Sequence, residues 1–562
     1  MELPPLLEKT TASPLYSEDL APIPPGKRTW GTWHMAALWV GMAVCIPTYL
    51  LASYMMRAGL DWQAALIIIG LANLVITVPM VLNGHAGVKY GIPFPVQGRA
   101  PFGTLGVHVP SLLRALVACG WFGVNAWIGG LSLYSIWSVI TGSTGDAGLS
   151  YGKFIAFGVF WTINIYFIWK GTERIKWLEA WSAPVLIGIG IALLAWGAMN
   201  AGGFIATLGQ GKQLQQATVQ LVPYADHPGR TLGLTPLLGK DGKVKATEYR
   251  IISSETKKDV PVEWLPLVGE TTEVPLVGAG QVKLQFRDAN GHVSSMVDVP
   301  LAAPPASTNM LWQYLMWFTA MVGFWATMAI SISDITRFAT TQKAQVAGQF
   351  IGLPGTMMFY SFVGIFVTCA AVVALPDVLI SEDAPWDPVS LIGKFNSPGV
   401  VIFAQFAMLI ATLSTNIAAN IIAPANAISN LFPKRISFRM GGLLAGLVGI
   451  VICPWWLMDE ISGILVFVSG LLGPVLGILL CDYFIVRKRT LSVPGLYAVD
   501  GEYSYTGGVN TRAMVALAGG VLVALAGFWV KPLEALYQIA WFTGFGVSFV
   551  LYALLMRRHT VG

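Results

Sequence analysis

The clearest shortage in this chain is charge, because only 11% of its 562 residues are Asp, Glu, Lys or Arg. A typical soluble domain has about 25%. Hydrophobic residues make up 55% of the chain, and they gather in runs of about 18–30 residues, long enough to cross a bilayer's hydrocarbon core. The composition excludes a soluble protein and predicts an all-α polytopic membrane protein.

Sequence motifs for enzyme chemistry are also missing. The chain has no P-loop, HExxH, GxSxG or CxxC pattern, so we expect neither an enzyme nor ATP-driven transport. Its five cysteines lie in apolar segments, without the spacing of metal ligands or of a disulfide framework. We expect no organic cofactor, no nucleic acid and no protein partner.

Titratable residues are missing from the middle of the apolar runs. Proton-coupled carriers use carboxylates or histidines inside the membrane as relays, so their absence favours Na⁺ as the coupling ion and leaves proton coupling as the alternative. The ionisable residues stand near the ends of runs, Asp334 and Arg337 among them. We predict that these two form an ion pair or gate at the cytoplasmic end.

Twelve apolar runs can be counted, at 32–57, 62–84, 109–140, 152–169, 177–200, 310–333, 346–375, 398–428, 438–456, 461–485, 513–530 and 536–556. An even number of crossings leaves both termini on one side of the membrane. The segments on that side hold nineteen basic residues, against four in the short loops opposite. The positive-inside rule therefore places both termini in the cytoplasm.

The polar segment 202–308 falls between the fifth and sixth runs, on the outside. Residues 281–288 alternate with period two, Asn290 and Gly291 follow as a turn, and 292–299 alternate again, which is the pattern of a hairpin. Further candidate strands are 218–222, 249–252 and 273–277. We predict a small all-β extracytoplasmic insert, with an immunoglobulin-like sandwich as a candidate fold and a disordered loop as the alternative.

The runs also suggest internal symmetry. Runs one to five and six to ten form two halves, and an odd number of crossings inverts the second half, as in many secondary transporters. Pro47 in the first run predicts a broken helix, and Gly323 predicts a weaker break in the sixth. The resulting divisions are a tail at 1–30, repeats at 31–200 and 309–485, the insert at 202–308, a cytoplasmic loop at 486–512, and two peripheral helices at 513–562.

Five polar side chains interrupt the eighth run between residues 411 and 420. On a helix, Ala411, Ser414 and Thr415 share one face, whereas Asn416 and Asn420 share another. Hydroxyl oxygens can bind a hard cation, and amides can pair with a small planar solute. The alternative is that the hydroxyls bond back to helix carbonyls. For Asn416 we expect only a structural hydrogen bond.

Aromatic residues stand in two other runs, and in one of them an amide accompanies the ring. Trp121 and Asn125 are four residues apart, so a ring and an amide project from one helix face. Phe324 and Trp325 form a second pair at the depth of the expected break in the first run. Rings and amides together suit a planar heterocycle; the alternative is ordinary helix packing.

Eight stretches in order resemble the nucleobase–cation symporters of the hydantoin, allantoin, uracil and cytosine group, most nearly the bacterial allantoin and uracil branch. They begin at Arg28 (RTW), Cys45 (CIPTY), Leu82 (LNGHAGVKYGIPFP), Trp121 (WFGVNAW), Asp334 (DITRFA), Gly348 (GQFIGLPG), Ser414 (STNIAAN) and Asp482 (DYFIVRKR). The resemblance implies a LeuT-type fold of five plus five inverted helices with two more helices. It also implies import by alternating access across a bacterial inner membrane.

The resemblance further implies roles for single residues. Trp121 and Trp325 would sandwich the substrate ring. Asn125 and Asn420 would bond its amide edges, and Cys45 and Phe324 would complete the pocket. The implied Na⁺ ligands are the carbonyls of Gly41, Val44 and Ala411 and the hydroxyls of Ser414 and Thr415.

Two departures from the family pattern bear on the substrate. Asn125 replaces the Gln of hydantoin carriers, and Cys45 replaces an amide found in several relatives. Both departures count against hydantoin itself, within a substrate class that includes uracil, allantoin and hydantoin. Thr415 keeps a hydroxyl that favours Na⁺. Two alternatives also stay open: a carrier of another solute, such as a nucleoside or vitamin precursor, and a receptor or scaffold acting through the outer β segment.

Overall fold

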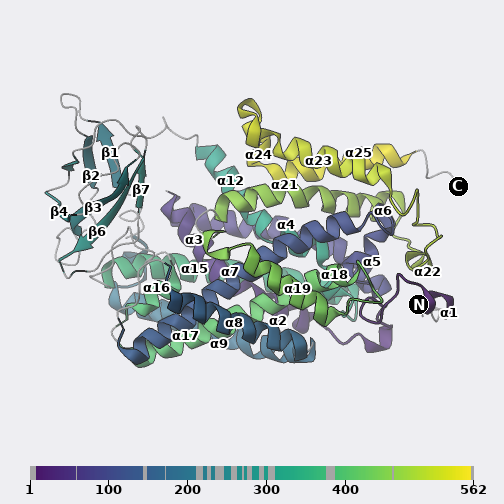
Figure 1. Ribbon diagram of the computed structural model, residues 1–562, viewed down its shortest axis with the longest axis horizontal. Coiled ribbons are helices and arrows are strands. Elements are labelled where there is room, and N and C mark those ends of the chain that lie inside the picture. The colour runs from purple at the N-terminus through teal and green to yellow at the C-terminus, as the bar shows by residue number, and fades with distance from the viewer. Residues whose placement is uncertain are drawn as a thin grey trace.

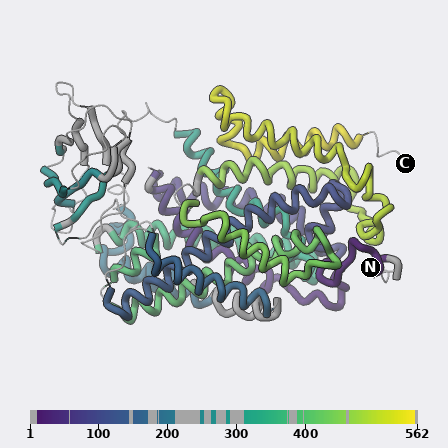
Figure 2. Tube along the Cα trace, in the orientation of Figure 1, coloured from purple at the N-terminus to yellow at the C-terminus, as the bar shows by residue number. Residues whose placement is uncertain are grey.

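The computed structural model describes residues 8–58, 60–143, 149–170, 172–209, 219–223, 230–234, 246–254, 263–268, 271–274, 281–289, 291, 297–300, 310–374, 387–395, 397–457 and 461–557. A body of helices makes up most of the molecule, and a group of strands lies at one end of it (Figures 1 and 2). Among the predicted strand and turn positions, 218, 275–277, Asn290 and 292–296 lie outside the described residues.

The first half of the chain is helical. It contains α1 (Glu8–Ala12), η1 (Pro25–Lys27), α2 (Thr32–Ala43), α3 (Ile46–Arg57), α4 (Trp62–Tyr90), α5 (Phe94–Gln97), α6 (Arg99–Phe102), α7 (His108–Thr141), α8 (Tyr151–Lys170) and α9 (Thr172–Asn200). The expected break in the first run is confirmed, because α2 and α3 meet at a bend of 55°. Pro47 stands in the first turn of α3, where its missing N–H costs no helix bond.

The second half begins with α12 (Met310–Phe324), α13 (Ala326–Ser331), α14 (Ser333–Thr336), α15 (Gln342–Ala374), α16 (Pro388–Gly393), α17 (Pro398–Asn420), α18 (Ile422–Ser429), α19 (Phe438–Val451), α20 (Pro454–Leu457), α21 (Ile461–Leu480) and the π-helix η2 (Cys481–Val486). It ends with α22 (Val493–Leu496), α23 (Thr511–Trp529), η3 (Lys531–Leu533), α24 (Glu534–Gln538) and α25 (Ala540–Met556). The sixth run is interrupted at Trp325, whose backbone leaves the helical region at φ −100° and ψ 5°.

Each of the twelve predicted runs coincides with a helix or with consecutive helices. Among the described residues, eight helices are long and apolar enough to cross a membrane, or up to ten if each sharply bent pair counts as one span. The ninth run fails this criterion because α19 has only 14 residues. The helices are those of a multi-pass membrane protein.

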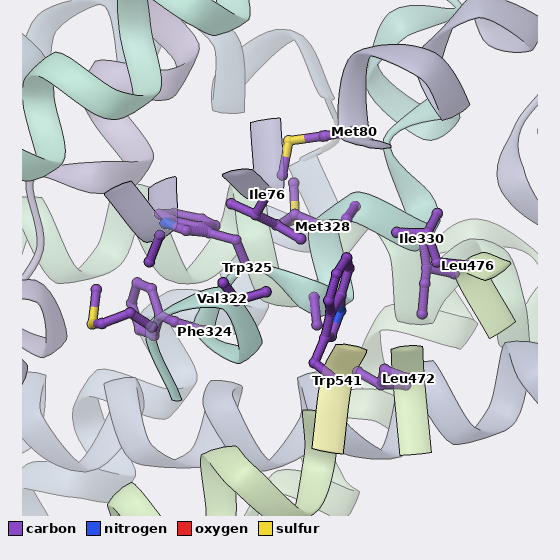
Figure 3. Close-up of a cluster of buried hydrophobic side chains, with 14 of the residues drawn as sticks. Ile76, Met80, Val322, Phe324, Trp325, Met328, Ile330, Leu472, Leu476 and Trp541 are labelled. Atoms are coloured by element: carbon purple, nitrogen blue, oxygen red, sulfur yellow. The ribbon is translucent and has the colours of Figure 1, made fainter. Parts of the chain in front are cut away.

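The sixth run starts at the exposed residues Met310 and Leu311 and is buried throughout from Thr319 to Ser333. Figure 3 shows Phe324 and Trp325 on one side of the close-up, and Leu472, Leu476 and Trp541 from α21 and α25 on the other. The C-terminal helices α23 and α25 cover the outer face of α21 (Figure 1). A break in this buried segment is therefore held in place by neighbours on several sides.

The strands lie between α9 and α12. They are β1 (Val219–Pro223), β2 (Arg230–Leu234), β3 (Ala246–Ser254), β4 (Leu265–Pro266), β5 (Thr271–Val274), β6 (Gln281–Asp288) and β7 (Val297–Pro300). They form two antiparallel sheets, in the orders β1-β2-β5 and β4-β3-β6-β7. The predicted hairpin is present as the β6–β7 pair, in which Gln281 faces Pro300 and Leu284 faces Val297.

The prediction of a β-rich segment from residue 202 onward is wrong at its start. Residues Phe204–Gly209 form the helix α10. The Phe204 ring stacks on Phe366 of α15 with 4.4 Å between centroids, and Thr207 is buried. This turn belongs to the helical body because its apolar face is covered by α15 and α9.

Candidate functional site

The break between α2 and α3 releases a backbone carbonyl. The N–H of Cys45 donates to the Ala43 oxygen at 3.0 Å, whereas in a continuous helix it would donate to Gly41. The Gly41 carbonyl instead accepts a hydrogen bond from the Thr415 hydroxyl of α17 at 3.1 Å. This hydrogen bond directly links α2 and α17, the two helices that carry most of the predicted cation ligands.

The other predicted cation ligands lie at the same contact between α2 and α17. Gly41, Val44, Ala411, Ser414 and Thr415 are all buried. Val44 and Ala411 belong to one buried apolar cluster. Backbone carbonyls and hydroxyls are the oxygen donors that suit a hard cation such as Na⁺, so the donor set fits the ion that the sequence favours.

The six predicted substrate residues line one cavity next to this contact. They are Cys45, Trp121, Asn125, Phe324, Trp325 and Asn420. Met42, Pro47, Thr327, Met328, Thr415 and Ala419 complete the lining. The cavity has a volume of about 30 Å³, whereas small-molecule pockets usually measure about 300–1,000 Å³. The cavity as it stands is too small for a heterocycle, so its rings must separate before one enters.

The aromatic walls of the cavity meet edge to face. Phe324 contacts Trp121 at 5.3 Å between centroids and 89° between planes, and it contacts Trp325 at 5.0 Å and 74°. Trp39 contacts Trp325 edge to face, with 5.2 Å between centroids and 80° between planes. Phe324 thus contacts both indoles in this form, and a substrate sandwich would require it to move.

Unpaired polar atoms lie beside these rings. Asn125 donates through Nδ2 to the Trp121 carbonyl at 3.0 Å, while its Oδ1 is buried without a partner among the described residues. The Trp325 Nε1 is likewise buried and unpartnered among them. An unpaired acceptor and an unpaired donor next to aromatic faces suit a planar solute with amide edges.

Asn420 is held by a chain of amides. Its Nδ2 donates to Asn416 Oδ1 at 3.1 Å. Asn416 in turn donates to the Phe122 carbonyl at 3.2 Å and to Asn164 Oδ1 at 3.1 Å. The expected structural role of Asn416 is confirmed, because it fixes the amide at the cavity and ties α17 to α7 and α8.

Arg114 was missed as part of the site. Its fully buried guanidinium donates to the carbonyls of Thr327 at 3.2 Å and Ala419 at 3.3 Å, and both residues line the cavity. The sequence did contain a signal for this role, because Arg114 lies five residues inside the apolar third run. Three cavity-lining helices, α7, α13 and α17, are joined by this one side chain.

Asp334 has different partners from those predicted. Its Oδ1 accepts hydrogen bonds from the Phe94 backbone N–H and from Asn426 Nδ2, each at 3.1 Å. No ion pair joins it to Arg337 in the described part of the chain. Burial raises the pKa of the Asp334 carboxyl to about 6, partly offset by the positive charges of Arg337 and Arg114.

The cavity, the broken helix and the polar α17 together describe a membrane carrier. A family model described as permease for cytosine/purines, uracil, thiamine, allantoin matches residues 22–222 and 271–544. The chain belongs to this family. The predicted resemblance is confirmed, and the gap in the match, residues 223–270, lies within the strand region.

Curated relatives agree with this assignment. The chain is similar to an allantoin permease of Bacillus subtilis, at 33% identity over 97% of this chain and 94% of the relative. It is 31% identical to a purine-uracil permease of Arabidopsis thaliana, over 97% of this chain and 78% of that protein. Because its relatives are permeases, the chain is a transporter and not an enzyme.

Solved structures share the fold. Mhp1, a nucleobase-cation-symport-1 family transporter in a closed conformation with bromovinylhydantoin bound, matches with a TM-score of 0.69 at 22% identity, over 97% of this chain and 96% of Mhp1. A Na⁺-coupled sialic acid symporter matches with a TM-score of 0.58 at 11% identity, over 94% and 90% of the two chains. The chain has the fold of a LeuT-type membrane transporter.

Proposed function

We propose that this permease imports a planar heterocycle of the allantoin, uracil or hydantoin class by alternating access, driven by Na⁺. The main support is the convergence of Cys45, Trp121, Asn125, Phe324, Trp325 and Asn420 on one cavity that also includes Thr415. A cavity with rings, an unpaired acceptor and an unpaired donor recognises shape and amide edges together.

Na⁺ coupling draws support from the chemistry of the same region. The described cavity lining contains no carboxylate and no histidine, the groups that proton-coupled carriers use as relays. Thr415 and Asn420 lie five residues apart on α17, about 7.5 Å along the helix axis. An ion that fixes α17 against α2 would also fix the amide that meets the substrate.

The chain just before α2 is linked to the segment after α14. Trp30 stacks on Phe338 at 5.3 Å between centroids. The Trp30 N–H donates to the Phe338 carbonyl at 3.0 Å, and the Thr340 N–H donates to the Trp30 carbonyl at 2.9 Å. Release into the cytoplasm would require these links, which join the start of α2 to the segment after α14, to separate.

The proposal includes an arrangement in the membrane. Twelve crossings form a five-plus-five inverted repeat with two further helices, both termini face the cytoplasm of a bacterial cell, and the protein resides in the inner membrane. The two sheets form an extracytoplasmic insert. The basic side chains around the ends of α4, η2 and α18 support this orientation.

A ligand panel tests the function. The full chain is purified and its thermal stability is measured with allantoin, uracil, hydantoin, cytosine and uridine, each in Na⁺ and in choline. Stabilisation by one planar heterocycle, larger in Na⁺, is the expected result. No shift with any nucleobase, allantoin or hydantoin would contradict the substrate class. Equal shifts in Na⁺ and choline, with uptake abolished by collapsing a pH gradient, would contradict Na⁺ coupling.

A further inference from the structure

A second pocket lies where α4 ends, α15 begins and η2 leads into the following loop. It has a volume of about 450 Å³ and is lined by His85, Val88, Lys89, Gln342, Lys488 and Arg489. Its lining contains three basic side chains and no carboxylate. No acidic residue of the described chain forms an ion pair with Lys89, Lys488 or Arg489. Uncompensated positive charge around a pocket attracts an anion.

The backbone holds two of these cations in an unusual conformation. Lys488 and Arg489 both have positive φ, 47° and 64°, which side chains with a Cβ rarely adopt. The arrangement is fixed by bonds from the N–H groups of Arg487 to the Asp482 carbonyl at 2.8 Å and of Arg489 to the Tyr483 carbonyl at 2.7 Å. Strain of this kind often marks a binding site.

Hydrogen bonds of the pocket residues join three elements. Lys89 Nζ donates to the Arg489 carbonyl at 2.6 Å. The Gln342 amide donates to the His85 carbonyl at 2.9 Å, and the His85 ring bonds the Tyr483 hydroxyl at 2.8 Å. The cations are therefore gathered at a fixed junction of α4, α15 and η2.

Exposed apolar side chains lead directly to this junction. Along α4, Val75, Val78 and Leu82 are 37–49% exposed, and Leu82 stands two helical turns before Lys89 on the same face. Along α15, Val346 and Phe350 are 36% and 38% exposed, one and two turns after Gln342. In a membrane carrier such surfaces face lipid, so the pocket opens at the edge of the bilayer.

We propose that this pocket binds the phosphate of an anionic phospholipid, whose acyl chains lie along the exposed faces of α4 and α15. A basic pocket between spanning helices, with apolar surface below it, is the chemistry that anionic headgroups require. A soluble phosphate would use the cations but not the apolar faces. The bound lipid would join α4 to the loop after η2.

The test is lipid binding by the purified full chain, measured by native mass spectrometry. Dioleoyl phosphatidylglycerol and dioleoyl phosphatidylcholine are compared, with glycerol 1-phosphate as the soluble competitor. One variant combines Lys89→Gln, Lys488→Gln and Arg489→Gln. The matched control combines Lys434→Gln, Arg435→Gln and Arg439→Gln, which removes the same charge from other exposed positions.

The wild type is expected to prefer phosphatidylglycerol by about tenfold or more. Each removed cation should weaken that binding by about fivefold, or on the order of 100-fold for three, while the control stays within about twofold. If the triple variant does not fold, Arg489→Gln alone should show the fivefold loss. Unchanged affinity in the pocket variants, or equal affinity for the two lipids, would overturn the proposal. Displacement by equimolar glycerol 1-phosphate would also overturn it, in favour of a soluble anion.

Discussion

Replacing Thr415 by valine should weaken Na⁺ binding with little change in shape, because valine keeps the branched volume and removes only the hydroxyl. In this structure that hydroxyl donates to the Gly41 carbonyl at 3.1 Å, and Thr415 is 5% exposed. The substitution therefore removes one proposed ion ligand and leaves a second, Gly41, without its partner.

The expected magnitude follows from the cost of a lost buried polar contact, about 1–3 kcal/mol. This corresponds to Na⁺ binding that is about five- to 150-fold weaker. At Na⁺ a hundred times above its dissociation constant, a bound ion stabilises the folded state by about 2.7 kcal/mol, and a tenfold loss of affinity reduces this to about 1.4 kcal/mol. The measurement is the shift in thermal stability as Na⁺ replaces choline, which requires no knowledge of the substrate.

Thr412→Val is the matched control on the same helix. Thr412 is also buried, at 1% exposure, but its hydroxyl donates to Met408 of its own helix at 2.8 Å. It should lose stability equally in Na⁺ and choline and keep the wild-type Na⁺ dependence. The reasoning is refuted if Thr415→Val and Thr412→Val respond to Na⁺ alike.

Three further predictions concern the substrate, the strand region and pH. Asn125→Ala removes the unpaired Oδ1 at the cavity and should weaken heterocycle binding about five- to 150-fold at saturating Na⁺, measured by ligand thermal shift; unchanged binding would remove Asn125 from the site. Deleting residues 211–308 while keeping α10, with a short Gly-Ser linker, should leave transport in liposomes largely intact, and its abolition would favour a working role for the outer segment. Because burial raises the Asp334 pKa to about 6 from an ordinary value of 3.8, the native carboxyl binds its proton more tightly than the unfolded one, so acidification from about pH 6 to pH 4 adds stability. Asp334→Asn should lack this gain in a pH series of melting curves, and an unchanged pH profile would contradict it.

Hydrophobic runs were sufficient to predict where the spanning helices lie, because hydrocarbon forces backbone groups to pair within each segment. They could not predict which helices bend. Pro47 predicted the break at α2 and α3, since proline lacks an N–H. Gly323 favoured a break in the sixth run, because glycine lowers helix stability, but it did not locate the break. In the structure the interruption falls at Trp325, whose ring packs against Trp39 and Phe324.

The sequence was also insufficient to predict which side chains contact each other. The period-two pattern was enough to predict β6 and its pairing with β7, yet the turn of helix at Phe204–Gly209 was missed because its apolar face matters only once α15 covers it. Asp334 was expected to pair with Arg337, which is close in sequence. It accepts hydrogen bonds from Phe94 and Asn426 instead, because burial places those donors nearer than any guanidinium.

The sequence by itself determined the membrane class, the family, and the presence of hydroxyls and amides in the middle of α17, since unpaired polar groups in hydrocarbon require partners. Only the tertiary structure decided which groups serve as their hydrogen-bond partners. Thr415 meets a carbonyl freed 374 residues earlier in the chain, and Asn420 is fixed through Asn416 to α7 and α8. Contacts between helices distant in sequence depend on packing geometry, which local periodicity does not encode.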